Sequence, residues 1–164
     1  LKSPIGAKRE HELQEELGAL DDGVQAVEPL TGTVRFTRTA NGVLATGRLH
    51  TVVRIDCRRC LRTFTTPVDF DLEEEFVPTI DVTTGTRLQI EGSEEALQID
   101  ERHMLDLAEV VRQYVIVYRE QYPLCSETCA GLCPVCGKNL NEGPCGCRDA
   151  SEDPRWAVLK ELLD

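Results

Sequence analysis

The sequence has 164 residues, of which 41% are hydrophobic, and a formal net charge of −11. A chain of this length can bury one hydrophobic core and a small satellite that is held together in another way. Its longest candidate membrane segment, YVIVY at 114–118, is far shorter than the roughly 20 apolar residues that cross a bilayer. The chain opens without a signal-type apolar stretch, so we expect a cytoplasmic protein.

The charge is distributed unevenly along the chain. Residues 1–64 carry a net charge of +2, whereas residues 65–164 carry −13. An acidic half of this kind repels phosphate backbones and suits a basic protein partner. The same charge is also typical of a surface that only keeps a protein soluble, so both interpretations stay open at this point.

The first half of the chain is predicted to form one helix followed by antiparallel strands. The segment AKREHELQEELGAL at 7–20 has leucines at helical spacing, which predicts a short helix. From Val24 to Phe76 the periodicity changes to two, and Asn41-Gly42 is a strong hairpin signal. The alternation predicts two buried strand faces, Leu49, Thr51, Val53 and Ile55 on one and Phe64, Val68, Phe70 and Leu72 on the next.

The second half is expected to contain a polar connection and two helices. Residues 79–102 have the composition of a loop, with a short strand around Leu88–Ile90. Asp100 can cap a helix that begins near residue 101 and ends before Pro123. Pro154 occupies a first-turn position of a last helix, RWAVLKELL.

Six of the eight cysteines lie in the segment CSETCAGLCPVCGKNLNEGPCGC at 125–147, which has too few apolar residues to fold around a core. In a cytoplasmic chain, C-x-x-C pairs indicate metal or redox chemistry rather than disulfides. Zinc binds four thiolates tetrahedrally, and a C-x-x-C turn followed by glycine presents two of them together. One predicted zinc site therefore has the ligands Cys133, Cys136, Cys145 and Cys147.

The remaining cysteines predict a second zinc site with the ligands Cys57, Cys60, Cys125 and Cys129. This site closes a loop across 64 intervening residues. The entropic cost of that closure is smaller than the binding free energy of structural zinc, roughly 10–16 kcal/mol. The pairing stays open at this stage, because Cys125 and Cys129 can instead share a metal with Cys133 and Cys136. In that case Cys57 and Cys60 share a metal with Cys145 and Cys147.

Iron–sulfur clusters and redox dithiols also use cysteine pairs. An iron–sulfur cluster takes four thiolates as well, but the Pro and Gly residues around Cys133 and Cys136 are typical of a zinc ribbon. The arginines of the C-R-R-C sequence at 57–60 can lower thiol pKa values. Thioredoxin-type motifs, however, lie at a strand-to-helix turn, whereas this one joins two predicted strands. Two closed sets of four thiolates leave no open coordination position, so we expect structural metals and no enzyme.

Together these elements predict an α+β fold class. It consists of an antiparallel β-sheet or partly open barrel with N-terminal, central and C-terminal helices, plus a small cysteine-rich zinc module. The expected domains are an α+β domain at 1–122 with a zinc-knuckle hairpin at 54–62, a cysteine-rich zinc module at 123–148 and a C-terminal helix at 149–164.

Five segments resemble the motifs of a known family: CRRCL at 57–61, DLEEEF at 71–76, DLAEVV at 106–111, PLCSETCAGLCPVCGKNLN at 123–141 and the tail DPRWAVLKELL. In this order they resemble the bacterial YceD family, the large ribosomal RNA subunit accumulation proteins, over residues 20–163. The resemblance implies a non-enzymatic cytoplasmic factor needed for accumulation or processing of large-subunit (23S) ribosomal RNA. Such proteins are often encoded beside a basic large-subunit ribosomal protein. Many relatives have only the first C-x-x-C, which implies that the shared role does not depend on the distal site.

A group of arginines suggests how such a factor contacts its partner. The segment RIDCRRCLR at 54–62 concentrates Arg54, Arg58, Arg59 and Arg62 on one predicted hairpin tip. Four guanidinium groups on a metal-rigidified tip suit the phosphates of ribosomal RNA or of an early large-subunit assembly particle. The same arginines can equally pair with carboxylates of the DLEEEF segment.

The acidic half supports an alternative function. In this alternative, the carboxylates of Glu73, Glu74 and Glu75 bind a basic large-subunit ribosomal protein, and the present chain acts as its chaperone. A thiol redox protein is a distant third hypothesis, which rests on the C-x-x-C pairs alone.

Overall fold

The computed structural model describes residues 2–88, 94–119 and 123–147. The chain forms two compact units. The first comprises Leu1–Ile55 and Phe64–Gln121, and the second comprises Asp56–Thr63 and Tyr122–Asp164. The second unit therefore takes one of its two segments from the connection between two strands of the first.

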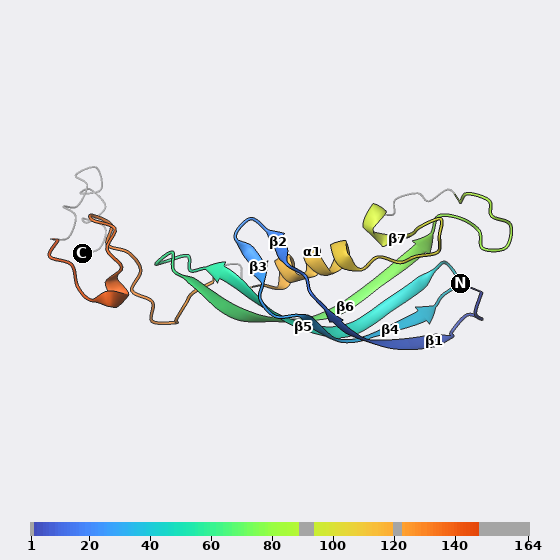
Figure 1. The fold of residues 1–164 in the computed structure, drawn as a ribbon, viewed down its shortest axis with the longest axis horizontal. Coiled ribbons are helices and arrows are strands. Elements are labelled where there is room, and N and C mark those ends of the chain that lie inside the picture. Colours follow the sequence, from blue (N-terminus) through green and yellow to red (C-terminus); the bar gives the residue numbers. More distant parts are fainter. Residues whose placement is uncertain (1, 89–93, 120–122, 148–164) are drawn as a thin grey trace, which may run out of the picture. The chain divides into compact units, whose positions relative to one another are not determined.

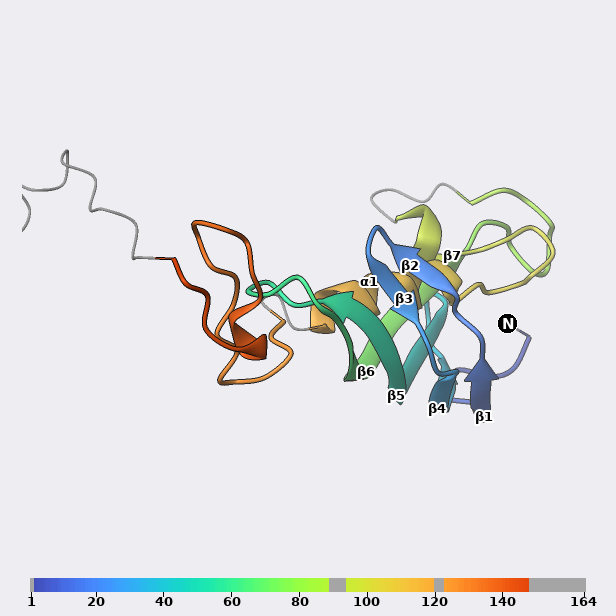
Figure 2. The same ribbon diagram turned by 60° about the vertical axis from the view of Figure 1, so that its left-hand side comes forward.

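The first unit is built on one open, largely antiparallel sheet. Its seven strands among the described residues are β1 (Lys8–Glu15), β2 (Ala19–Asp21), β3 (Val24–Ala26), β4 (Leu30–Arg38), β5 (Val43–Asp56), β6 (Thr63–Pro78) and β7 (Gln98–Ile99). The strand order is β1-β4-β5-β3-β2, and β6 pairs with β5 and β7. Only the short β7 runs parallel to its neighbour, β6. Figure 2 shows β1, β4, β5 and β6 side by side.

The predicted hairpin at Asn41-Gly42 is confirmed. It joins β4 to β5 in an antiparallel register that starts at Arg38 opposite Val43. A side chain at Gly42 would place its Cβ 1.9 Å from the carbonyl oxygen of Phe76, so the close approach of this turn to β6 requires glycine.

One face of the sheet and one side of the helix α1 (Ala108–Tyr118) form the core (Figure 1). The predicted inward faces of β5 and β6 are confirmed, since Leu49, Thr51, Val53, Ile55, Val68, Phe70 and Leu72 are buried, with Phe64 partly so. The helix contributes Val110, Val111 and Val115. Valine is a weak helix former, but the burial of each valine stabilises the fold by about 1.5–3 kcal/mol, which outweighs that preference.

The helix predicted at residues 7–20 is wrong, because this segment forms the strands β1 and β2. β1 pairs with β4 along its whole length, from Lys8 opposite Thr37 to Glu15 opposite Leu30. The intrinsic preference of these residues favours a helix, but the ladder with β4 pairs the backbone groups on one side of β1, so tertiary pairing outweighs propensity here.

The central helix also differs from its prediction, because it begins at Ala108 rather than near residue 101. The carboxylate of Asp100 accepts hydrogen bonds from the backbone N–H groups of Arg102 and Met104, in a turn that precedes the helix. Asp106 instead accepts from the N–H of Ala108, at 2.8 Å, where the helix begins. The helix ends at Tyr118, in agreement with the prediction that it ends before Pro123.

The described residues therefore contain one α-helix and two short 3-10 helices, Glu95–Leu97 and Leu140–Glu142, and the fold is mostly β, with fewer helices than predicted. The predicted C-terminal helix and most of the predicted strand around Leu88–Ile90 lie outside the described residues. No helix in the described part of the chain is long and apolar enough to cross a membrane.

Candidate metal centres

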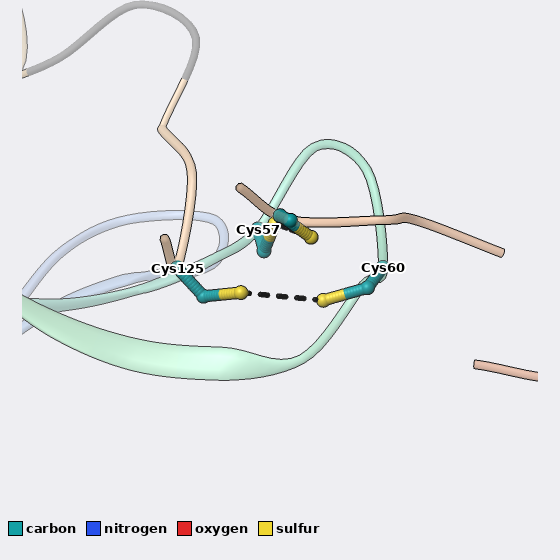
Figure 3. A group of neighbouring side chains, drawn as sticks. Cys57, Cys60 and Cys125 are labelled. Carbon is teal, nitrogen blue, oxygen red and sulfur yellow. Dashed lines mark hydrogen bonds between the residues drawn. The ribbon is translucent and has the colours of Figure 1, made fainter. Parts of the chain in front are cut away.

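The first cluster of cysteines joins two distant segments of the chain within the second unit. Cys57 and Cys60 come from the turn between β5 and β6, and Cys125 and Cys129 come from the cysteine-rich segment. Their four sulfur atoms lie within 4.8 Å of one another. The sulfur atoms of Cys57 and Cys129 are 3.8 Å apart. Those of Cys60 and Cys125, which point toward each other in Figure 3, are 3.5 Å apart.

These separations fit a tetrahedral metal ion. Four thiolates at about 2.3 Å from one ion lie about 3.8 Å from one another, which is close to the two sulfur distances in this cluster. All eight cysteines are free thiols, and Cys57, Cys60 and Cys129 are buried. The cluster can therefore hold a metal ion, and it consists of the same four residues that the spacing suggested.

The second cluster lies entirely within the cysteine-rich segment. It consists of Cys133, Cys136, Cys145 and Cys147, whose sulfur atoms also lie within 4.8 Å of one another. Between its two halves, the Lys138 ammonium donates to the carbonyl oxygen of Pro144 at 3.1 Å, and Leu140–Glu142 form a 3-10 turn. The cluster is more open than the first, because Cys136 is exposed. This group of four can also hold a metal ion.

The two C-x-x-C turns have the same backbone geometry. In the first, the N–H of Leu61 donates to the carbonyl oxygen of Cys57 at 2.9 Å, and in the second the N–H of Gly137 donates to that of Cys133, also at 2.9 Å. Both N–H donors belong to residues in the left-handed region, with φ of 58° at Leu61 and 72° at Gly137. The turn thus requires a left-handed residue directly after the second cysteine.

Asn141 connects the two clusters. It lies between the cysteines of the second cluster, yet its side-chain amide donates to the sulfur of Cys129, in the first, at 3.4 Å. Its oxygen accepts from the N–H of Ala130 at 2.8 Å, and the oxygen of Asn139 accepts from both nitrogens of Asn141. The Asn141 hydrogen bond is the main cause that lowers the pKa of Cys129.

In each cluster the pKa of at least one thiol is lowered and the pKa of at least one other is raised. Burial raises the pKa of Cys57, but backbone N–H groups, first among them that of Cys125, outweigh it and bring the pKa to about 6. Burial is the main cause that raises the pKa of Cys125 to about 12. The backbone N–H of Cys136 is the main cause that lowers the pKa of Cys133 to about 6, and the Cys136 side chain raises that of Cys147 to about 12. A cation among the four sulfurs favours the thiolate form of all four cysteines.

The four predicted RNA-binding arginines are all exposed and have different surroundings. Arg54 belongs to β5 of the first unit and donates to the Gln25 side chain at 3.3 Å. In the second unit, Arg59 donates to the carbonyl oxygen of Cys129 at 3.1 Å, and the backbone N–H of Arg58 donates to the carbonyl oxygen of Pro123 at 3.0 Å. The side chain of Arg62 makes no ion pair or hydrogen bond with the residues that the structure describes. Arg59 therefore also helps to hold the first cluster together.

The predicted protein-binding glutamates are divided between the two faces of β6. Glu73 and Glu75 are exposed, whereas Glu74 is half-buried on the face that packs against α1. There the carboxylate of Glu74 accepts a hydrogen bond from the Tyr114 hydroxyl at 2.9 Å. The carboxylate of Glu75 accepts from the Thr39 hydroxyl at 2.6 Å.

Sequence reasoning did not predict the hydrogen bond from Asn141 to Cys129. Asn139 and Asn141 both fit ordinary turn chemistry, so their spacing alone does not distinguish a turn residue from a partner of a cysteine. Leu61, in contrast, could have been recognised, because it directly follows a C-x-x-C pair as Gly137 does.

Comparison with known proteins identifies the family. The family model described as large ribosomal RNA subunit accumulation protein YceD matches residues 45–163. Uncharacterised proteins of Mycobacterium tuberculosis and Mycobacterium bovis are 34% identical over 148 residues, which cover 90% of this chain and 67% of theirs. No solved structure matches the chain significantly. The chain therefore belongs to the YceD family of large ribosomal RNA subunit accumulation proteins.

Proposed function

We propose that this protein is a non-enzymatic, cytoplasmic factor for the accumulation or processing of large-subunit (23S) ribosomal RNA. In this proposal it binds the RNA, or an early large-subunit assembly intermediate, through the arginine tip, which we define as residues 57–62. The family description supports the ribosomal role. The observation that carries the RNA contact is the exposure of Arg58, Arg59 and Arg62 on a turn whose two cysteines belong to a four-cysteine cluster.

The clusters suit a structural role. We propose that each holds one Zn²⁺ ion, since four thiolates in tetrahedral reach of one another are the typical ligands of structural zinc. Four protein ligands complete the coordination of such an ion, so there is no position for a substrate. The metal of the first cluster then rigidifies the arginine tip. The tip therefore loses less conformational entropy when it binds RNA.

The RNA contact is tested by co-sedimentation of the metal-loaded protein with large-subunit precursor particles, with and without nuclease. The variants are Arg58→Ala and Arg62→Ala. Arg59 is left unchanged, because its side chain also binds the carbonyl oxygen of Cys129. Each variant should weaken association and lower the slope of log affinity against log salt by roughly one. Unchanged association of both variants would contradict an RNA contact at the tip.

A second candidate function is an acidic chaperone for a basic large-subunit ribosomal protein. It is favoured by one specific pattern, since Asp69, Asp71, Glu73 and Glu75 are exposed at every second position of β6. Such a stripe of carboxylates attracts a basic partner. In this case the complex survives nuclease, and Glu73→Lys combined with Glu75→Lys abolishes it. Glu12→Lys combined with Glu15→Lys, on the exposed positions of β1, reverses the same number of charges elsewhere and is the control.

A further inference from the structure

Leu61 occupies an unfavourable position at the arginine tip. Its φ of 58° lies in the left-handed region, which residues other than glycine, asparagine and aspartate rarely adopt. The residue is also 67% exposed, although burial of a leucine side chain is favourable. The residue is therefore strained in its backbone and gains little from packing within the chain.

The second metal cluster shows that the backbone does not need a leucine here. Gly137 follows its C-x-x-C pair in the same position, with φ of 72° and the same 2.9 Å hydrogen bond to the carbonyl oxygen of the first cysteine. Glycine adopts this conformation without strain. Since strained residues cluster at functional sites, the exposed side chain of Leu61 calls for a role outside the folding of its own turn.

The surroundings of Leu61 favour a polyanionic partner. Arg58, Arg59 and Arg62 are exposed in the same turn. The acidic residue of this segment, Asp56, already accepts a hydrogen bond from the Thr63 hydroxyl at 2.6 Å. An exposed apolar side chain in the same turn as exposed guanidinium groups suits a polymer that alternates phosphates with flat apolar faces, which is the chemistry of RNA with unpaired bases.

We propose that Leu61 contacts RNA directly, and that its side chain packs against the face of an unpaired base while Arg58 and Arg62 bind neighbouring phosphates. This inference rests on the proposed function and adds a preference to it. Phosphate contacts position a protein on RNA but do not distinguish paired from unpaired segments. Apolar side chains that pack against base steps require unstacked bases. Leu61 therefore makes binding to single-stranded or bulged RNA tighter than binding to paired RNA.

The test uses Leu61→Gly in the full, metal-loaded chain. The probes are a large-subunit ribosomal RNA transcript, a single-stranded RNA and a fully paired duplex of the same length, each titrated at several salt concentrations. Leu61→Gly should bind the transcript and the single strand roughly tenfold more weakly than the wild type, with an unchanged salt slope, because no charge is lost. Affinity for the duplex should not change. Metal content should stay the same, and the melting temperature should stay the same or rise, because the strain is relieved.

Two further variants separate the possible outcomes. Leu61→Met keeps an apolar side chain and should bind within a few-fold of the wild type. Arg62→Ala should lower the salt slope by roughly one and weaken binding to all three RNAs. If Arg62→Ala weakens binding while Leu61→Gly binds like the wild type, the inference about Leu61 is overturned and the proposed function stands.

Other results overturn more than the leucine contact. If neither variant changes RNA binding, the tip does not contact RNA, and the proposed function fails at this site together with the inference. If Leu61→Gly loses metal or melts at a lower temperature, Leu61 has a structural role and the inference is overturned. Association with a protein partner that is lost in Leu61→Gly and survives nuclease also overturns it, in favour of a protein contact.

Discussion

The side-chain amide of Asn141 donates a hydrogen bond to the sulfur of Cys129, 3.4 Å away, although the two residues belong to different metal clusters. The same side chain accepts from the backbone N–H of Ala130, next to Cys129. A residue from the loop of one cluster thereby orients a ligand of the other. Partners of this kind typically change metal affinity by 10–100-fold when they are removed.

The first prediction follows from this hydrogen bond. Asn141→Asp keeps the oxygen that accepts from Ala130 but loses the N–H donor to Cys129 and adds a negative charge. The variant should bind the metal of the first cluster about 10–100-fold more weakly, measured by competition with a chelator and by the thiolate-to-cobalt absorption of Co²⁺-loaded protein. Glu142→Gln, a neighbouring change in the same loop, should have little effect. Equal affinities of Asn141→Asp and the wild type would contradict a role for Asn141 in the first cluster.

The second prediction concerns metal content and removal. Protein purified without chelator should contain two zinc ions per chain, one for each four-cysteine cluster. Removal of the metal should unfold the second unit and leave the first folded, because the hydrophobic core of the first unit contains no cysteine. Elemental analysis and amide hydrogen exchange before and after chelation provide the measurement. One zinc ion, iron in its place, or loss of protection in β4 and β5 would be inconsistent with this arrangement.

The third prediction tests the link across the chain. Cys125→Ser should speed amide exchange in residues 56–63 as well as in its own segment, since the first cluster joins the two. Cys145→Ser removes a ligand of the second cluster and should leave residues 56–63 protected. The outcome that rules out the link is equal protection of the 56–63 turn in Cys125→Ser and the wild type.

The fourth prediction uses the glycine that follows the second C-x-x-C pair. Gly137→Ala places a Cβ on a residue with φ of 72° and should destabilise the second cluster by about 1–2 kcal/mol. Gly146→Ala is a matched control, because no atom lies within 4 Å of its added Cβ and its φ is not in the left-handed region. Metal affinity from chelator competition should fall for the first variant and stay nearly constant for the second. A fall of the same size in both would show that the left-handed turn is not the cause.

The strands that sequence reasoning found were those with one buried face. Leu49, Thr51, Val53 and Ile55 are buried in alternation on β5, and this pattern is visible in the sequence because the opposite residues are more polar. β1 has no such pattern, since its eight residues include only one leucine, which is half-buried. At such an edge strand the pairing with β4 decides the structure, and a single sequence does not reveal that pairing. The adjacent Asp22-Gly23 turn was a usable signal for strands in this region.

The two groups of four cysteines could be anticipated because C-x-x-C turns present two sulfurs by local geometry alone. The contacts around them depend on tertiary structure. The donation from Asn141 to Cys129 and from Arg59 to the carbonyl oxygen of Cys129 join residues that are 12 and 70 positions apart. Neither contact has a spacing that distinguishes it from other arrangements of the same residues.

The division of the first cluster between two segments determines when it can form during synthesis. Cys57 and Cys60 leave the ribosome well before Cys125, because 64 residues lie between Cys60 and Cys125, so the growing chain carries an unsatisfied dithiol while β6 and α1 are made. The turn can acquire its complete set of ligands only after Cys129 has emerged. A chain that terminates early therefore keeps a reactive pair of thiols at an arginine-rich turn, whereas a full-length chain can sequester both. Metal closure of this cluster is thus a chemical mark that synthesis has passed Cys129.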